Sequence, residues 1–128
     1  MLDMHTIGSP VWNGEDNYGL PGRSEMWALN IINDAWAILA QRYCSYPNVI
    51  MADIFNEPYA ASWPEWTAFV QDVGSRILHI CNRWLIAVEG AGQGWQSCWG
   101  EDLSGLRHAP IELAVANRLV MAPHTYGQ

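Results

Sequence analysis

Short apolar runs that end abruptly in a polar residue constrain the fold of this chain more than any other feature. Four such runs occupy residues 2–4, 49–55, 84–88 and 119–123, and they lead into His5, into Asn56 and Glu57, into Glu89, and into His124. Runs that are apolar along their length are typical of strands in a parallel sheet covered on both faces. Because the carboxyl ends of parallel strands meet at one edge, where barrel enzymes hold their catalytic groups, we expect these polar residues to form a site there.

Two helices are predicted between the first three runs. Residues 7–23 form a loop rich in Gly, Asn, Asp and Pro, after which Ser24 is the expected N-cap, and Pro47 ends the segment. The expected buried stripe of this helix is Trp27, Ile31, Ala35, Ile38 and Leu39. In the second helix Ser62 and Glu65 form a capping box. Its apolar face is Trp66, Phe69, Val70, Val73, Ile77 and Ile80.

This order of elements predicts an α/β fold, part of a TIM (β/α)8 barrel with about four parallel strands and intervening helices. The runs after Glu57 are spaced close to the roughly 31 residues per unit of a complete barrel of about 250 residues. Four strands do not close a barrel, so we expect residues 1–128 to be an incomplete catalytic domain with both ends cut. A small open doubly wound sheet is the alternative. Open sheet edges would also invite self-association.

The charge and composition of the chain argue against several functions. A net charge of −7, with only six basic residues, disfavours nucleic acid as a partner. No segment approaches the roughly 20 apolar residues of a membrane span. The first residues lack the basic and apolar regions of a signal peptide, so we expect none in this chain.

Three cysteines, Cys44, Cys81 and Cys98, allow one disulfide and a spare thiol, or three buried thiols. Their spacing does not resemble a zinc site, so no metal is expected from them. Cys44 and Cys81 each fall at the end of a predicted helix, and in a barrel such ends lie on the same face. We therefore predict that these two pair in an oxidising compartment.

Glu57 is the strongest candidate for chemistry. Hydrolysis of a glycosidic bond needs one carboxylic acid to protonate the leaving oxygen and a second carboxylate on the other side. A glutamate at a strand end, partly desolvated and near another carboxylate, has a raised pKa and holds a proton near neutral pH. Asn56 beside it can donate to a sugar hydroxyl. A strand that simply ends in a turn at Pro58 is the alternative.

The sequence around Glu57 resembles glycoside hydrolase family 5 of clan A. The segments Tyr-Pro-Asn-Val-Ile (46–50) and Ile-Phe-Asn-Glu-Pro (54–58) are similar to the fourth-strand signature of that family. Residues 2–5 resemble its third strand, residues 84–90 its fifth strand as seen in cellulases, and residues 117–120 with 123–127 its sixth. The likeness covers essentially the whole chain in the right order. It implies a secreted, cofactor-free, retaining endo-β-1,4-glucanase that acts on cellulose or a related β-glucan.

The resemblance also implies roles for individual residues. Glu57 matches the general acid/base, and Asn56 matches the neighbour that hydrogen-bonds the sugar 2-hydroxyl at the −1 subsite. His5, His124 and Tyr126 match positions that line this subsite. The family's nucleophile is a glutamate on the seventh strand, which this chain does not reach, so the chain is expected to be inactive alone.

Two positions depart from the family pattern. Thr6 follows His5 where many relatives have Arg, and Tyr59 follows Pro58 where His is common. These differences leave the substrate open, with a β-mannanase that shares the same catalytic apparatus as the alternative. A truncated fragment that binds glucan without catalysis is the other alternative.

Tryptophans are the candidate stacking platforms for sugar rings. Trp95 and Trp99 lie on a long glycine-rich loop, which indicates function, and Trp12 is a weaker candidate. Packing beneath the loop is the alternative role. Trp27, Trp36 and Trp66 fall within predicted helices and are expected in the core.

Glu89 is the other glutamate at a strand end. It belongs to the unit next to Glu57 rather than across the barrel, so we expect it to hydrogen-bond in the floor of the site. Asp3, His5, Glu57 and His124 have an alternative interpretation as ligands of a metal-dependent hydrolase. We expect Asp3 to face away from His5, which disfavours that interpretation. A histidine at a strand end can also be a hydrogen-bonded core residue.

Overall fold

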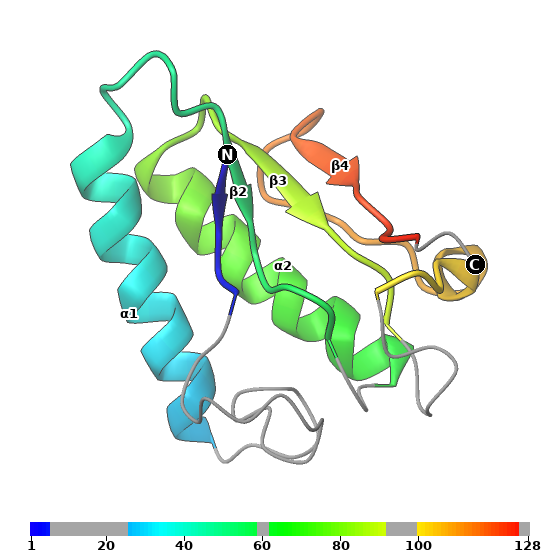
Figure 1. Ribbon diagram of the computed structural model, residues 1–128. Helices are drawn as coiled ribbons and strands as arrows, with labels where there is room; N and C mark the ends of the chain where they lie inside the picture. Colours follow the sequence, from blue (N-terminus) through cyan, green and yellow to red (C-terminus); the bar gives the residue numbers. More distant parts are fainter. Residues whose placement is uncertain (6–25, 59–61, 92–99, 126–128) are drawn as a thin grey trace.

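The computed structural model describes residues 1–5, 26–58, 62–91 and 100–125, without the side chains of residues 26–30 (Figure 1). The elements in order are β1 (Leu2–Asp3), α1 (Met26–Tyr43), β2 (Met51–Asp53), α2 (Trp63–Ile80), β3 (Leu85–Val88), the short 3₁₀ helix η1 (Ser104–Arg107) and β4 (Leu119–Met121). Each strand lies within one of the predicted apolar runs and is shorter than it.

The four strands form one sheet in the order β1-β2-β3-β4, and every neighbouring pair is parallel. Four parallel strands were predicted, and this prediction is confirmed. Figure 1 shows α1 and α2 side by side on the same face of the sheet. Strands that follow one another in order, with their helices on one face, make a section of a barrel, whereas a doubly wound sheet has helices on both faces. The doubly wound alternative is therefore wrong.

The register of the sheet separates a helix-facing row of side chains from a row on the opposite face. Leu2, Ala52, Ile86 and Leu119 pair in one row, and all four belong to or pack against the hydrophobic core. The next row along the strands is Asp3, Asp53, Ala87 and Val120. Because successive side chains of a strand point to opposite faces, this second row lies on the face away from the helices. Two carboxyl groups are therefore neighbours inside the partial barrel.

The predicted buried stripe of α1 is wrong at Ile31 and Ile38, whereas Leu39 packs against the core and Ala35 is half-buried. Ile31 and Ile38 are 47% and 64% exposed, and the fully buried residues are Ile32, Trp36 and Ala40. Apolar residues occur on more than one face of this helix, so spacing alone does not identify the buried one. The indole N–H of Trp36 donates to the carbonyl oxygen of Ile54 at 3.1 Å, which fixes the face that meets the sheet.

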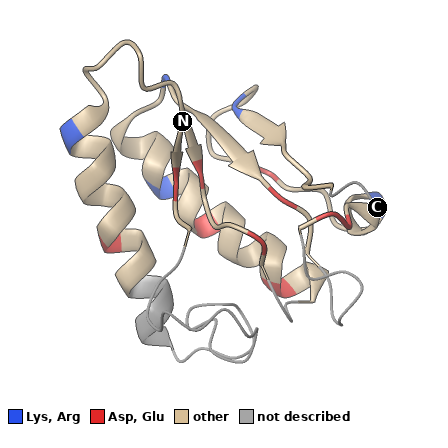
Figure 2. Ribbon diagram, in the orientation of Figure 1, with Lys and Arg blue, Asp and Glu red and all other residues tan. Residues whose placement is uncertain are grey.

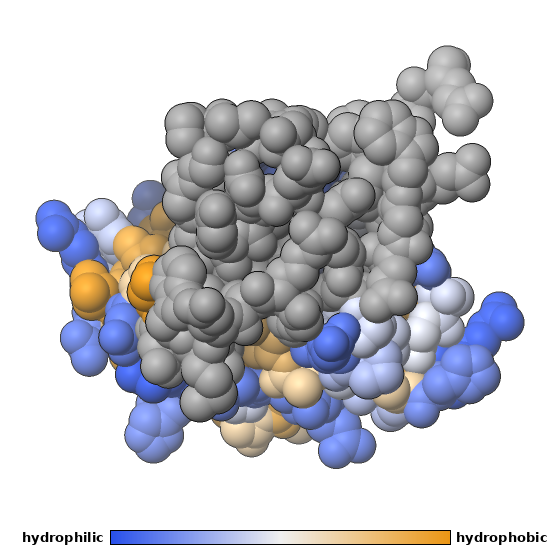
Figure 3. All heavy atoms as spheres, turned by 90° about the horizontal axis from the view of Figure 1, so that it is seen from below, coloured by the Kyte–Doolittle hydropathy of each residue, from blue (hydrophilic) through white to orange (hydrophobic). Residues whose placement is uncertain are grey.

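The exposed face of α1 is visible at the surface. Viewed from the carboxyl ends of the strands, hydrophobic side chains reach the surface on the side where α1 lies (Figure 3). The side chain of Trp27 lies outside the described residues. Trp36 is buried, as predicted.

The prediction for α2 is confirmed in most details. Ser62 is the N-cap, and its backbone N–H donates to the carboxylate of Glu65 at 3.0 Å. The predicted apolar residues of α2 are buried except Ile80, which is half-buried. Neither α1 nor α2, the two long helices among the described residues, is apolar enough over its length to cross a membrane.

The loops at the amino ends of β2 and β3 are fastened together. Cys44 and Cys81 form a disulfide, as predicted. The guanidinium group of Arg83 donates to the carbonyl oxygens of Cys44 at 2.6 Å and Val49 at 2.8 Å, and also to that of Tyr46. Cys98 lies outside the described residues. The loops before β2 and β3, at the end of the sheet opposite the polar strand ends, are thus joined by one covalent bond and by the hydrogen bonds of Arg83.

Candidate active site

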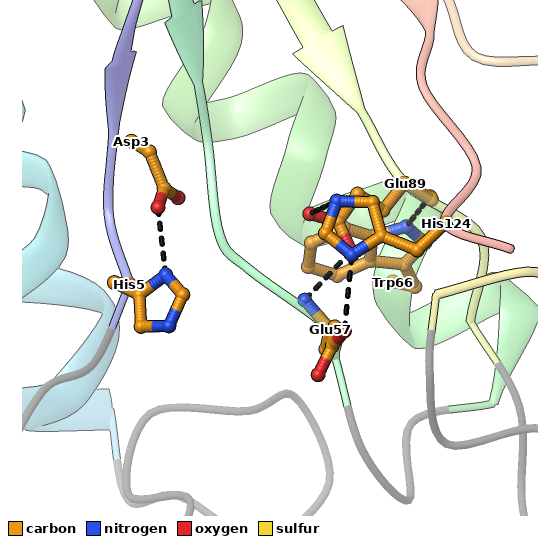
Figure 4. Close-up of polar contacts among 6 residues, drawn as sticks. All are labelled: Asp3, His5, Glu57, Trp66, Glu89 and His124. Atoms are coloured by element: carbon orange, nitrogen blue, oxygen red, sulfur yellow. Dashed lines mark hydrogen bonds and ion pairs between the residues drawn. The ribbon is translucent and has the colours of Figure 1, made fainter. Parts of the chain in front are cut away.

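Three side chains meet where β2, β3 and β4 end. The Nδ1 atom of His124 lies 3.0 Å from Oε1 of Glu57, and its Nε2 atom lies 3.2 Å from Oε1 of Glu89. One imidazole ring therefore contacts both carboxyl groups (Figure 4). Glu57 is 7% exposed and Glu89 is fully buried. The sequence predicted that Glu57 and His124 would lie at the same edge of the sheet, and this is confirmed.

The backbone of Glu57 is held in an uncommon conformation. Its φ angle is +47°, in the left-handed region that non-glycine residues seldom adopt. The N–H group of Glu57 donates to Oε2 of Glu89 at 2.7 Å. Residues that their neighbours hold in an uncommon backbone conformation cluster at functional sites. The expected hydrogen bond of Glu89 in the floor of the site is confirmed, and its partner is the backbone of Glu57 itself.

Neighbouring groups fix Glu89 in turn. The indole N–H of Trp66, a core residue as predicted, donates to the carbonyl oxygen of Glu89 at 3.0 Å. Gly100 has a φ angle of +70°, and a Cβ atom at this position would overlap the carboxyl group of Glu89. Only glycine meets both conditions without strain. Glu89 is therefore enclosed by α2 on one side and by the backbone at Gly100 on another.

Burial and neighbouring charges raise the pKa values of two carboxyl groups, Glu89 and Asp53. The pKa of Glu89 is raised to about 8, mainly by burial and also by the charges of Asp53, Glu57 and Asp3, against the opposing hydrogen bond from the Glu57 N–H. Burial likewise raises the pKa of Asp53 to about 7, with Asp3 adding to the shift and His124 opposing it. Figure 2 shows acidic residues on the strands and just beyond their carboxyl ends. Among the described residues, a histidine ring is the partner of the carboxyl group in each of the close contacts Asp3–His5, Glu57–His124 and Glu89–His124.

His5 lies apart from the Glu57 group. Its Nδ1 atom is 2.8 Å from Oδ2 of Asp3, so the prediction that Asp3 faces away from His5 is wrong. Residues two apart in a strand share a face, because side chains alternate with a period of two. Figure 4 shows the Asp3–His5 pair separated from Glu57, Glu89 and His124. Within the described ranges, no three His, Cys, Asp or Glu residues are grouped as metal ligands.

The remaining predicted site residues divide into two sets. Asn56 is half-buried beside Glu57, and its backbone N–H donates to the carbonyl oxygen of Met4 at 3.1 Å, which ties the ends of β1 and β2 together. The other set lies outside the described residues and comprises Thr6, Trp12, Tyr59, Trp95, Trp99 and Tyr126.

Asp53 is a site residue that the sequence interpretation missed. It is 3% exposed, and its Oδ1 atom has no hydrogen-bond partner among the described residues. It pairs in register with Asp3 on β1. The available signal was a single carboxylic acid within an otherwise apolar run, residues 49–55. A buried charge in a strand is costly unless it is paired or neutralised, so such a residue indicates a polar interior.

The fold and this cluster define the class of the protein. Parallel strands in sequential order carry carboxyl and imidazole groups at their carboxyl ends, as in enzymes built on a (β/α)8 barrel. The combination suits acid/base catalysis, because the carboxyl groups are desolvated and one imidazole joins them.

Comparisons with known proteins identify the family. A family model described as cellulase, glycosyl hydrolase family 5, matches residues 1–128. An endoglucanase of Paenibacillus polymyxa is 38% identical over 144 residues, which cover 99% of this chain and 34% of that protein. The major extracellular endoglucanase of Xanthomonas campestris pv. campestris is 33% identical, over 83% of this chain and 25% of that protein. The chain belongs to glycosyl hydrolase family 5, and it spans about a third of the Paenibacillus relative.

Solved structures agree with this assignment. The catalytic domain of the Xanthomonas endoglucanase matches with a TM-score of 0.76 and 30% identity, over 98% of this chain and 38% of that one. An endocellulase of Pyrococcus horikoshii in complex with cellotetraose matches with a TM-score of 0.71 and 30% identity, over 98% of this chain and 40% of that one. The predicted partial barrel of four parallel strands is therefore confirmed.

Proposed function

We propose that residues 1–128 carry the acid/base half of a retaining endo-β-1,4-glucanase, with Glu57 as the general acid/base. In the first step Glu57 protonates the glycosidic oxygen as the bond breaks, and in the second it removes a proton from the attacking water. The observation that carries this proposal is the position of the Glu57 carboxyl group. It is buried at the end of β2, contacted by His124, and its backbone is held by Glu89.

The nucleophile of this reaction is proposed to lie outside the chain, on the seventh strand of the complete barrel. Glu89 is unsuited to that role, because its carboxyl group is fully buried and its two oxygens face the Glu57 N–H and the His124 ring. A retaining reaction also requires two carboxyl groups about 5 Å apart on either side of the bond. We therefore expect residues 1–128 alone to be inactive.

Other residues are proposed to bind the sugar. Asn56 would donate to the 2-hydroxyl group, and His5, His124 and Tyr126 would line the −1 subsite. Trp95 and Trp99 would stack on neighbouring sugar rings. The half-buried position of Asn56 beside Glu57 supports the first of these assignments. No cofactor is needed, because the reaction uses only carboxyl groups and water.

We propose a β-1,4-glucan as the substrate and secretion as the location. The first assignment is supported by relatives named endoglucanases and by a structural neighbour solved with cellotetraose. The second is supported by one relative's description as extracellular and by the Cys44–Cys81 disulfide, which forms in oxidising compartments.

The test of Glu57 uses the full-length protein with Glu57→Gln, and Glu112→Gln, at an exposed position, as the control. We expect the first variant to lose about 10²- to 10⁴-fold in turnover of carboxymethyl cellulose while still binding cello-oligosaccharides. On an aryl cellobioside with an acidic phenol as the leaving group, Glu57→Gln should slow the first chemical step less, because this leaving group needs no protonation. Unchanged hydrolysis of carboxymethyl cellulose would refute the role of Glu57.

Two further measurements address stereochemistry and completeness. Proton NMR of the first product should show the β-anomer for a retaining enzyme, and an initial α-anomer would indicate inversion. Reducing-sugar release should occur with a barrel extended beyond residue 128 and not with residues 1–128 alone. Activity of the short chain would mean that another carboxylate, foremost Glu89, completes the pair. Hydrolysis of mannan but not glucan would make the protein a β-mannanase.

A further inference from the structure

We propose that Glu89 is a positioning residue that exchanges a proton with Glu57 through the imidazole ring of His124. This inference rests on the proposed function, because it concerns how the acid/base of that reaction holds its proton. Glu89 itself does not touch the substrate in this proposal; it acts on Glu57 and His124.

The geometry of the three side chains carries the proposal. The two ring nitrogens of His124 face different carboxyl groups, Nδ1 at 3.0 Å from Glu57 and Nε2 at 3.2 Å from Glu89. The first contact is a hydrogen bond, whereas Oε1 of Glu89 is buried without an aligned hydrogen bond among the described residues. Catalytic hydrogen bonds are often poorly aligned in the free enzyme and tighten when substrate binds, and the proposal requires the second contact to align in this way.

The second oxygen of Glu89 keeps the carboxyl group in place during such a transfer. Oε2 accepts the Glu57 N–H at 2.7 Å, and the Glu89 carbonyl accepts the indole N–H of Trp66 at 3.0 Å. The Glu89 carboxyl group is therefore connected to Glu57 in two ways, directly to the Glu57 backbone N–H and indirectly to the Glu57 carboxyl group through the His124 ring (Figure 4). Loss of the Glu89 carboxyl group would disturb both the conformation of Glu57 and its proton.

The proton transfer balances without any outside group. In one state Glu57 is protonated, neutral His124 carries its proton on Nε2, and Glu89 is a carboxylate. The Glu57 proton then moves to Nδ1 while the Nε2 proton moves to Oε1 of Glu89. In the resulting state Glu57 is the carboxylate, His124 is neutral with its proton on Nδ1, and Glu89 is the acid. The three groups together carry one negative charge in both states.

The negative charges around Glu89 favour retention of one proton by the three side chains Glu57, His124 and Glu89. Asp53 on β2 and Asp3 on β1 face it with negative charge, together with Glu57. From α2 it meets the neutral indole of Trp66, and from the β3–β4 connection it meets the backbone at Gly100. A second ionised carboxyl group in such surroundings is disfavoured, so Glu57 and Glu89 are expected to share one proton over a range of pH.

The test is a carboxyl-carbon NMR titration of residues 1–128 labelled with ¹³C, with ¹⁵N detection of the His124 ring. We expect the Glu57 carbon to titrate in two steps, the upper one coinciding with the step of Glu89, because groups that share a proton titrate together. The Nδ1 and Nε2 signals should exchange proton occupancy at the same upper step. This readout does not require catalytic activity.

Glu89→Gln is the main variant, because the amide has the same size and still accepts the Glu57 N–H. It should abolish the upper step of Glu57 and leave only the lower one. Glu112→Gln, which removes the same charge from an exposed position, should leave both steps unchanged. If Glu89→Gln does not fold, His124→Gln serves instead, and Glu57 and Glu89 should then titrate independently. A single Glu57 step in the unsubstituted chain would overturn the proposal.

A pH profile of the full-length enzyme separates this role from a merely structural one. Glu89→Gln should move the alkaline limb of the kcat/KM profile to lower pH, because Glu57 loses the proton that Glu89 returns to it. A uniform loss at every pH would indicate only a structural role for Glu89. The NMR result stands apart from the hydrolysis test of Glu57→Gln, so failure of the proton exchange and failure of the proposed function are distinguishable.

Discussion

Removal of the Cys44–Cys81 disulfide should destabilise this chain by about 4 kcal/mol. The two cysteines are separated by 37 residues, so the bond closes a loop that includes β2 and all of α2. The chain-entropy relation gives a loss of roughly 13 cal/mol/K from the unfolded state for a loop of this length, which is about 4 kcal/mol at 25 °C. Arg83 still joins the same loops through three carbonyl oxygens, so we expect the folded structure to persist.

The measurement is urea unfolding of residues 1–128 followed by circular dichroism. The variant carries Cys44→Ala and Cys81→Ala together, and Cys98→Ala is the control for loss of a thiol outside the disulfide. The double variant should unfold at a lower urea midpoint, whereas the control should match the parent chain. Reductant should destabilise the parent and leave the double variant unchanged. A destabilisation below about 1 kcal/mol would show that loop closure in the unfolded state is not how this bond stabilises the chain.

Two further predictions concern the site. Gly100→Ala should lower the free energy of unfolding by about 2–4 kcal/mol, because the φ angle of +70° is strained for alanine and its Cβ overlaps Glu89; an unchanged urea midpoint would contradict the close packing described. The free energy of unfolding should also fall as pH rises from about 4 to 8, since the folded-state pKa values of Asp53 and Glu89 lie near 7 and 8, above their usual 3.8 and 4.5. Both groups favour folding fully below their unfolded pKa values and lose that contribution as pH passes the folded values. Urea unfolding at pH 5 and pH 8 measures this, and Glu89→Gln should flatten the dependence; equal stability at both values would refute it.

The strands and α2 were predictable because each has a strong local signal. The capping box of Ser62 and Glu65 marks the start of α2, and its apolar face has one clear period. The buried face of α1 was not predictable in this way, because Ile31 and Ile32 are adjacent and only contact with the sheet selects between them. Local spacing gives the period of a helix, but tertiary contacts decide which of two apolar stripes becomes buried.

The position of Glu57 followed from the sequence, whereas its connections did not. A strand that ends in Asn56 and Glu57 places the carboxyl group at the site edge, and the run that ends at His124 brings the imidazole to the same edge. The hydrogen bond from the Glu57 N–H to Glu89 depends on a φ angle of +47° at Glu57. Because Glu57 is not a glycine, the sequence does not predict this backbone conformation. Long-range contacts of this kind require the folded arrangement of three strands.

The two ends of the sheet contribute differently, one to stability and the other to chemistry, and the variants proposed above can distinguish these contributions. The disulfide and Arg83 join loops at the amino ends of the strands, whereas Glu57, Glu89 and His124 meet beyond the carboxyl ends. In barrel enzymes the first end serves stability and the second serves chemistry. Loss of the disulfide should therefore lower the urea midpoint without altering the titration that the proposed proton exchange predicts for Glu57. Glu89→Gln should alter that titration whatever it does to the midpoint. A change in the Glu57 titration on loss of the disulfide would mean that the two ends are coupled through β2 and β3, and that the rigidity of the loops contributes to the proton affinity of the site.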